Sequence, residues 1–267
     1  MQHNEISGNV TYYLNKSSRI NPVKLMHQDL YDVVGWTLSA TQQILSPLGL
    51  QNEYRPPTFA HASTQKGESP VLLQSGGFID RYESIHVKWM RLQTHKLDLA
   101  LVMIYPTARP ELIPLFAAEW VVIGDKIPVV VLDVYPLQSE GPLQQELSTV
   151  YTPLGVRYQS CLPKKQPLPE CFAQLAQPWA LFSECTIEQL PLLASAFRDY
   201  LTAALEGWYL PRQHRCGGKQ AAAVHEYKRR RYIDSEGRKL LEIIFGKVFT
   251  EEFLRWHCGP PHQPLEL

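Results

Sequence analysis

The stretch IHVKWMRLQTHKLDLALVMIYP at residues 85–106, with LFAAEWVVIGDKIPVVVLDVYP at residues 115–136, decides the fold of this chain. It contains four runs rich in apolar and β-branched residues: Ile85–Leu92, Leu97–Tyr105, Ala117–Ile123 and Pro128–Val134. Short connections separate the runs, and they contain Thr94-His95, three prolines and Gly124-Asp125, respectively. Such runs, bounded by turn residues, predict consecutive strands of an antiparallel meander.

Helical patterns flank this predicted sheet on both sides. Apolar residues recur at near-helical spacing in several segments, and Pro, Gly and Ser residues mark a connection. The predictions are a helix over Val23–Leu48, a connection over residues 51–70, a short helix from Gly141-Pro142, a loop over Leu162–Pro169, a long helix over Thr186–Trp208 and a helical pair around Phe245-Gly246. Strands in the middle with helices before and after predict a three-layer α/β/α sandwich with a central antiparallel sheet. We expect one domain over residues 1–267, with residues 1–20 as a polar N-terminal arm.

Composition narrows the possible functions. The 267 residues carry a formal net charge of zero, so no overall field favours nucleic acid or a membrane surface. No run approaches the ~18 apolar residues of a spanning helix, and the N-terminus lacks a signal-peptide pattern, so we expect a cytoplasmic protein. The five cysteines are scattered without a Cys-x-x-Cys pair, which predicts no metal site. Glycine-rich nucleotide fingerprints are also missing from the sequence, so electrons for any redox chemistry must come from a partner or a diffusible cofactor.

Two ionisable residues stand inside the apolar runs. His86 lies near the start of the first run, and Glu119 lies in the third, three residues after the end of Pro114-Leu115-Phe116. Burying a carboxylate without compensation costs several kcal/mol. Glu119 must therefore be protonated, be paired with a cation or take part in a functional site. For His86 the alternative is an ordinary core histidine. Asp133, by contrast, is interpreted as a turn residue at the end of the fourth run.

Several motifs together resemble the ferredoxin-dependent bilin reductases. The family pattern has a strand ending in a hydrophobic-Pro pair, a Leu-Pro-Leu-Phe-type turn, a small-small-Asp strand and a strand ending Asp-x-x-Pro. The matching pieces are Ile104-Tyr105-Pro106, Ile113-Pro114-Leu115-Phe116, Ala117-Ala118-Glu119 and Asp133-Val134-Tyr135-Pro136. Weaker support comes from Phe245-Gly246-Lys247 with Glu252-Phe253-Leu254, and from Pro178-Trp179-Ala180-Leu181-Phe182. The resemblance covers residues from about Val71 to the C-terminus.

This resemblance implies a function. Members reduce biliverdin, or a dihydrobiliverdin, to a phycobilin or phytobilin by coupled single-electron and proton transfers. They bind no metal or flavin and take electrons from reduced ferredoxin, and we expect a monomer here. Each bilin radical must be protonated on a chosen carbon, which requires an acid within hydrogen-bond reach. By the resemblance, Glu119 replaces the family aspartate, His86 matches a family histidine and Asp234 matches a loop acid; Asp234 could instead cap the helix that follows it.

Cationic residues supply the remaining candidates. Either Arg238 and Lys239, or Lys164 and Lys165, are predicted to hold the two propionates of the pigment by charge-assisted hydrogen bonds. The run Lys228, Arg229, Arg230 and Arg231 is interpreted either as a docking site for acidic ferredoxin or as a solvated helix face.

Two departures from the family pattern keep alternatives open. Lys88 stands where the phycocyanobilin-forming members have a glutamate that protonates the outer vinyl group. Leu101 stands where they have a second histidine, which faces the aspartate. A non-catalytic bilin carrier of the same fold therefore remains an alternative. A further alternative is an enzyme like red chlorophyll catabolite reductase, which shares the fold and uses a glutamate in its pocket.

Overall fold

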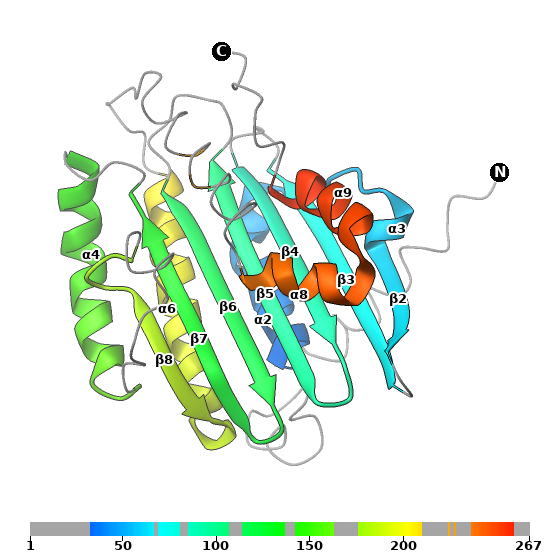
Figure 1. Cartoon of the computed structure of the whole chain (residues 1–267). Coiled ribbons are helices and arrows are strands. Elements are labelled where there is room, and N and C mark those ends of the chain that lie inside the picture. Colours follow the sequence, from blue (N-terminus) through cyan, green and yellow to red (C-terminus); the bar gives the residue numbers. More distant parts are fainter. Residues whose placement is uncertain are drawn as a thin grey trace.

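The computed structural model describes residues 33–66, 69–80, 85–106, 114–136, 142–162, 176–209, 224, 227 and 236–258. The described strands form one antiparallel eight-stranded sheet in the order β1-β3-β4-β5-β6-β7-β8, and β2 also pairs with β3 (Figure 1). Their bounds are β1 Gln51–Asn52, β2 His61–Lys66, β3 Ser69–Ile79, β4 Ile85–Gln93, β5 Leu97–Pro106, β6 Leu115–Ile123, β7 Lys126–Tyr135 and β8 Leu181–Thr186. From β3 to β8, each strand therefore pairs with the next one along the chain, which confirms the predicted meander.

Turn chemistry sets the register of the central strands. Ile123 pairs with Lys126, so Gly124 and Asp125 form a two-residue hairpin loop, and Gly124 has a φ of 61°. Glycine takes that left-handed conformation without steric cost. At the β4–β5 turn, the Thr94 hydroxyl accepts hydrogen bonds from the backbone N–H groups of Lys96 and Leu97 at 3.1 and 3.0 Å. These turns fix which side chains face each side of the sheet.

Three long helices cover one face of the sheet: α2 Val33–Leu45, α4 Pro142–Gln159 and α6 Leu190–Tyr209 (Figure 1). They pack on a core that includes Val102, Trp120 and Phe197. The indole of fully buried Trp120 donates a hydrogen bond of 3.0 Å to Thr37 on α2, so its one polar group is satisfied in the core. We call this the α6 face.

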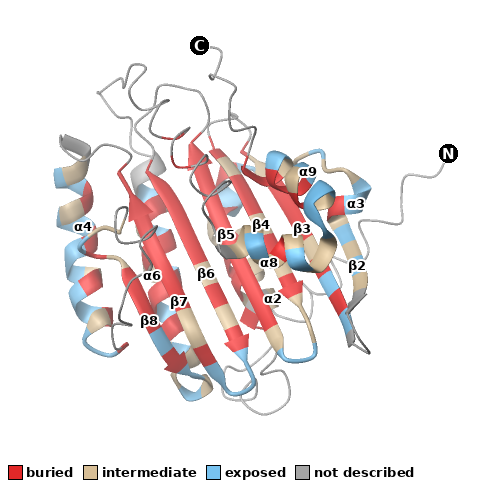
Figure 2. Cartoon of the chain, viewed as in Figure 1, coloured by how far each residue is buried: buried red, intermediate tan, exposed pale blue. Residues whose placement is uncertain are grey.

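Two C-terminal helices, α8 Glu236–Phe245 and α9 Lys247–Cys258, lie over the opposite face. Gly246, with a φ of 86°, ends α8 and allows the chain to turn into α9. A second core joins these helices to the sheet through Leu241, Phe253 and Leu254. Figure 2 shows the strands mostly buried and the outer helix surfaces exposed. We call this the α9 face, and the two faces together confirm the predicted three-layer sandwich.

Several local predictions were wrong. The segment interpreted as a connection over residues 51–70 contains β1, the short helix α3 Pro57–Ala60 and β2. The long helix predicted over Thr186–Trp208 is confirmed as α6, but its first residues form a 3₁₀ turn at Ile187–Gln189, and the strand β8 before it was not predicted. The helix predicted as short is the 18-residue α4. The helical pair around Gly246 is confirmed, and the described part of the first predicted helix is α2. Within the described part of the chain, no helix is long and apolar enough to cross a membrane.

Candidate active site

His86 and Glu119, two of the acid–base residues predicted from the sequence, lie on the α9 face. On β4, His86 alternates with Ile85 and Val87, which both belong to the core of the α6 face. On β6, Glu119 alternates in the same way with Ala118 and Trp120. Because side chains alternate across a strand, His86 and Glu119 both point to the α9 face. Each is partly exposed among the described residues, in contrast to its buried neighbours.

The register shows that these two residues are not neighbours. His86 pairs with Tyr105 on β5, whereas Glu119 pairs with Leu101, four residues earlier on that strand. With strands about 4.8 Å apart and about 3.4 Å per residue, their Cα atoms lie roughly 17 Å apart. His86 and Glu119 are therefore too far apart to share a proton directly, because neither side chain can span that distance. They occupy separate parts of one face.

Apolar side chains form the floor between them. Leu101, Met103 and Tyr105 from β5 and Ala117 from β6 are all buried and belong to the core of the α9 face. The hydroxyl of Tyr105 contacts the sulfur of Met103 at 3.1 Å. The rings of Tyr105 and Tyr135 both pack on Tyr227, with centroids 6.5 and 5.2 Å apart. This part of the face is thus aromatic and apolar, and it lies between the ionisable residues His86 and Glu119.

Lys88 is held in a buried ion pair. Its Nζ lies 2.5 Å from Oε2 of Glu53 and 4.2 Å from the ring centroid of Trp256 on α9. A Cβ at Gly77 would collide with Oε2 of Glu53, so the carboxylate of Glu53 would have to shift. Burial lowers the pKa of Lys88, and the hydrogen bond and charge of Glu53 oppose that effect. Lys88 is therefore directed towards β1 and α9, away from the strand that carries Glu119.

Asp133 is a buried strand acid that the sequence interpretation did not treat as a candidate site residue. It lies inside β7 and is 1% exposed, so its interpretation as a turn residue was wrong. Its carboxyl accepts backbone hydrogen bonds from Val134 at 2.7 Å and Gln177 at 3.2 Å. Burial raises its pKa to about 8, although these hydrogen bonds and one with Tyr135 act in the other direction. The same signal that singled out Glu119, an acid within an apolar strand, was available for Asp133.

Of the cationic residues predicted to bind the propionates or ferredoxin, only Arg238 and Lys239 lie within the described residues. Arg238 on α8 donates hydrogen bonds to Glu242 at 2.9 Å and to Glu251 at 3.3 Å, so it links α8 to α9. Lys239 is exposed on α8. The other predicted site residues lie outside the described residues: Asp234, Lys164, Lys165, Lys228, Arg229, Arg230 and Arg231.

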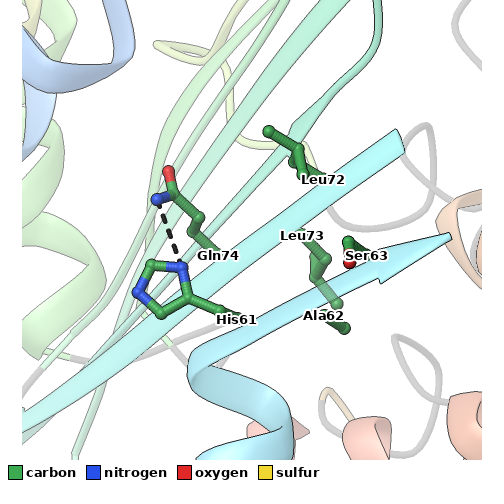
Figure 3. Close-up of a pocket in the computed structure, with 6 residues that line it drawn as sticks. All are labelled: His61, Ala62, Ser63, Leu72, Leu73 and Gln74. Carbon is green, nitrogen blue, oxygen red and sulfur yellow. Dashed lines mark hydrogen bonds between the residues drawn. The ribbon is translucent and has the colours of Figure 1, made fainter. Parts of the chain in front are cut away.

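A hollow on the outer strands lies apart from this face. Figure 3 shows its lining by residues of β2 and β3, where Nε2 of Gln74 lies 3.4 Å from Nδ1 of His61. None of the residues predicted from the sequence lines it, and β2 is four strands from β6. It is not part of the candidate site.

Comparisons with known proteins agree with the fold and the motifs. A family model described as ferredoxin-dependent bilin reductase matches residues 38–256. Among solved structures, phytochromobilin synthase from tomato in complex with biliverdin is similar with a TM-score of 0.71. That match has 17% sequence identity and covers 82% of this chain and 80% of the tomato protein. A search of curated proteins found no match.

Proposed function

This chain belongs to the ferredoxin-dependent bilin reductase family, and on that basis we propose that it reduces biliverdin, or a dihydrobiliverdin, with electrons from reduced ferredoxin. The product would be a phycobilin or phytobilin. The observation that carries the proposal is the shared placement of His86 and Glu119 on the α9 face, around a buried floor of Leu101, Met103 and Ala117. The biliverdin bound by the similar tomato protein supports the same class of substrate.

The proposed chemistry follows from the arrangement of the face. A flat conjugated pigment would lie on the apolar floor, where removal of its surface from water favours binding. Reduction of one double bond takes two electrons, one from each of two reduced ferredoxins, and two protons. Glu119 would donate one proton, and its side chain reaches about 1.5 Å further than the family aspartate. That extra reach would allow protonation of a different carbon.

The other residues would bind and orient the pigment. His86, at the other end of the face, would hydrogen-bond the lactam oxygens of the substrate. Among the cations, exposed Lys239 or the pair Lys164 and Lys165 would hold the propionates. Arg238 fits that role less well, because its guanidinium already binds Glu242 and Glu251. Ferredoxin would dock at Lys228–Arg231, and Asp234 would supply a further acid.

An anaerobic assay tests this function directly. Purified protein, biliverdin, ferredoxin and a reducing system are combined, and the pigment is followed by absorption and identified by chromatography. Loss of the biliverdin band with a new, shifted product supports the proposal. The reaction must depend on ferredoxin, so an otherwise complete mixture without ferredoxin is the control.

The bilin carrier is the second candidate. Two observations favour it: Lys88 is held by Glu53 instead of facing the pigment, and Leu101 lies opposite Glu119. A carrier would shift the absorption spectrum of biliverdin on binding but would leave the pigment unreduced in the complete mixture. The matching family model favours bilins over chlorophyll catabolites as ligands.

A further inference from the structure

Asp133 and Glu119 stand on adjacent strands of the same face. Asp133 pairs with Ala117 on β6, and Glu119 is the next residue on that side of β6. The two Cα atoms are therefore diagonal neighbours, roughly 8 Å apart. Ala117 pairs with Asp133 on one side and with the floor residue Met103 on the other, so only a small side chain stands between these two residues. The α9 face thus carries a second acid, buried on β7.

Asp133 is coupled by a hydrogen bond to Tyr135, two residues further along the same side of β7. Both side chains are buried, and the Tyr135 ring packs on Tyr227 with a centroid distance of 5.2 Å. By strand spacing, Tyr135 lies roughly 14 Å from Glu119. A donor at Tyr135 and a donor at Glu119 would therefore serve different parts of one pigment.

The surroundings of Asp133 favour its neutral form. Its carboxyl is fully buried, and the described part of the chain gives it no cationic partner. Among the described residues, the titratable groups around it include Tyr135 on β7, Glu119 on β6 and Tyr200 on α6. Burial raises the pKa of Tyr200, so Tyr200 stays protonated and neutral. Asp133 therefore holds a proton at neutral pH, with a pKa of about 8.

We propose that Asp133 and Tyr135 form a second proton-delivery pair for bilin reduction, separate from Glu119. This inference rests on the proposed function. The Tyr135 O–H bond breaks as its proton passes to the one-electron-reduced pigment, and the Asp133 carboxyl returns a proton to the phenolate. Water then reprotonates Asp133 when product leaves. The two electrons come from two reduced ferredoxins, and the second proton comes from Glu119. The reduction of each double bond therefore has the two electrons and two protons that it needs.

In this scheme Tyr135 is the donor and Asp133 is a positioning residue that acts through it. The test compares Tyr135→Phe, Asp133→Asn and the double variant in single-turnover reduction, with the decay of the bilin radical as readout. Tyr135→Phe keeps the ring packing on Tyr227, and Asp133→Asn keeps the size of the side chain. Asp98→Asn is the matched control, because Asp98 is also a buried sheet acid but pairs with Arg91 on the α6 face.

We expect each single variant to slow radical decay at least about 100-fold, the lower end of the usual range for general acids. The double variant should be no slower than the slower single variant, because the two groups act in series. The wild-type rate should fall as pH rises through about 8, where Asp133 loses its proton, and Asp133→Asn should lack that dependence. Biliverdin binding should remain unchanged in all variants, including Asp98→Asn.

A stability measurement checks the titration without turnover. The folded pKa of Asp133 lies above its unfolded value, so its stabilising contribution is complete below about pH 4 and is lost as pH rises to about 8. Wild type should lose stability across that window, by at most about 1.4 kcal/mol per pH unit, relative to Asp133→Asn. Equal stability slopes would overturn the inference.

Two kinetic outcomes are distinguishable. If wild type reduces biliverdin and both single variants keep its rate and pH profile, the inference is overturned, and Asp133 merely ties Gln177 to β7. If wild type leaves biliverdin unreduced, the proposed function fails together with the inference. Should Asp133→Asn not fold, Tyr135→Phe alone decides, because an unchanged radical decay in that variant contradicts the scheme.

Discussion

Leu101 on β5 and Glu119 on β6 are direct cross-strand partners on the α9 face. Residues paired in this way have their Cβ atoms about 5 Å apart, so a polar group at position 101 would reach the Glu119 carboxyl. On its other side Glu119 pairs with Val131. The acid is thus flanked by two apolar side chains at the position where the bilin reductase pattern has a histidine facing an aspartate. This relationship leads to the first two predictions.

Replacing Glu119 with Gln should block turnover while biliverdin still binds. The substitution keeps the size of the side chain and removes the titratable proton, so electrons can enter but protonation fails. We expect at least about a 100-fold lower rate of product formation and an accumulated bilin radical, measured by electron paramagnetic resonance. Glu184→Gln, at an exposed position on β8, is the control. A normal steady-state rate in Glu119→Gln would remove Glu119 from the mechanism.

Leu101→His should restore a titratable partner opposite Glu119. A neighbouring imidazolium favours the carboxylate, so the pair should titrate as a coupled unit. We expect a shifted pH optimum and a changed ratio of products by chromatography. Burying the imidazole should lower the free energy of unfolding by about 1–3 kcal/mol. Leu99→His, two residues earlier on the same face, is the matched control, and identical product ratios in the two variants would contradict the prediction.

His86→Gln should change the absorption spectrum of bound biliverdin as well as the rate. The expectation rests on its partial exposure on the α9 face, where it would contact the lactam oxygens. His95→Gln in the β4–β5 turn is the control. A spectrum identical to that of wild type would make His86 a core residue.

Breaking the Lys88–Glu53 pair should destabilise the fold more than removing both charges. Lys88→Met leaves a largely buried carboxylate without its cation, which costs about 3–5 kcal/mol in comparable buried pairs. The double variant Lys88→Met/Glu53→Leu should recover most of that loss. Urea denaturation measures both, with Lys126→Met, an exposed cation, as the control. Equal losses in the single and double variants would show that the two side chains are not energetically coupled.

The rate with ferredoxin should fall clearly between low and high ionic strength. Steering of an acidic partner by Lys228–Arg231 is screened by salt, with a Debye length of about 10 Å at 0.1 M. Arg229→Glu/Arg230→Glu should raise the apparent KM for ferredoxin and leave biliverdin affinity unchanged. A salt-insensitive rate, or normal ferredoxin kinetics in the double variant, would place the docking surface elsewhere.

The central strands could be predicted from the sequence because their apolar runs and turn residues are local signals. The outer strands could not. β2 has the polar sequence HASTQK and β8 is short, and both exist because they pair with the edges of longer strands. Tertiary pairing of this kind overrides weak local preference.

The candidate site, like the sheet, could be predicted from the sequence only in part. Alternation places His86 and Glu119 on one face, but only the register reveals the separation between them. The partner of Lys88, Glu53, comes from a segment 35 residues earlier and has no local signature. Asp133 was overlooked because its motif ends in proline, although it lies within the strand and not after it.

The consecutive pairing of β3 to β8 has a consequence for synthesis on the ribosome. Neighbouring strands need only short loops to meet, so the meander can form early and quickly. The helices that cover its α9 face, however, are the last described elements to be made. Until α8 and α9 emerge, Leu99, Leu101 and Met103 remain without these covering helices, although all the described strands have been made. The nascent chain is therefore most prone to aggregate before α8 and α9 are made, and a chain that stops before Glu236 stays in that state.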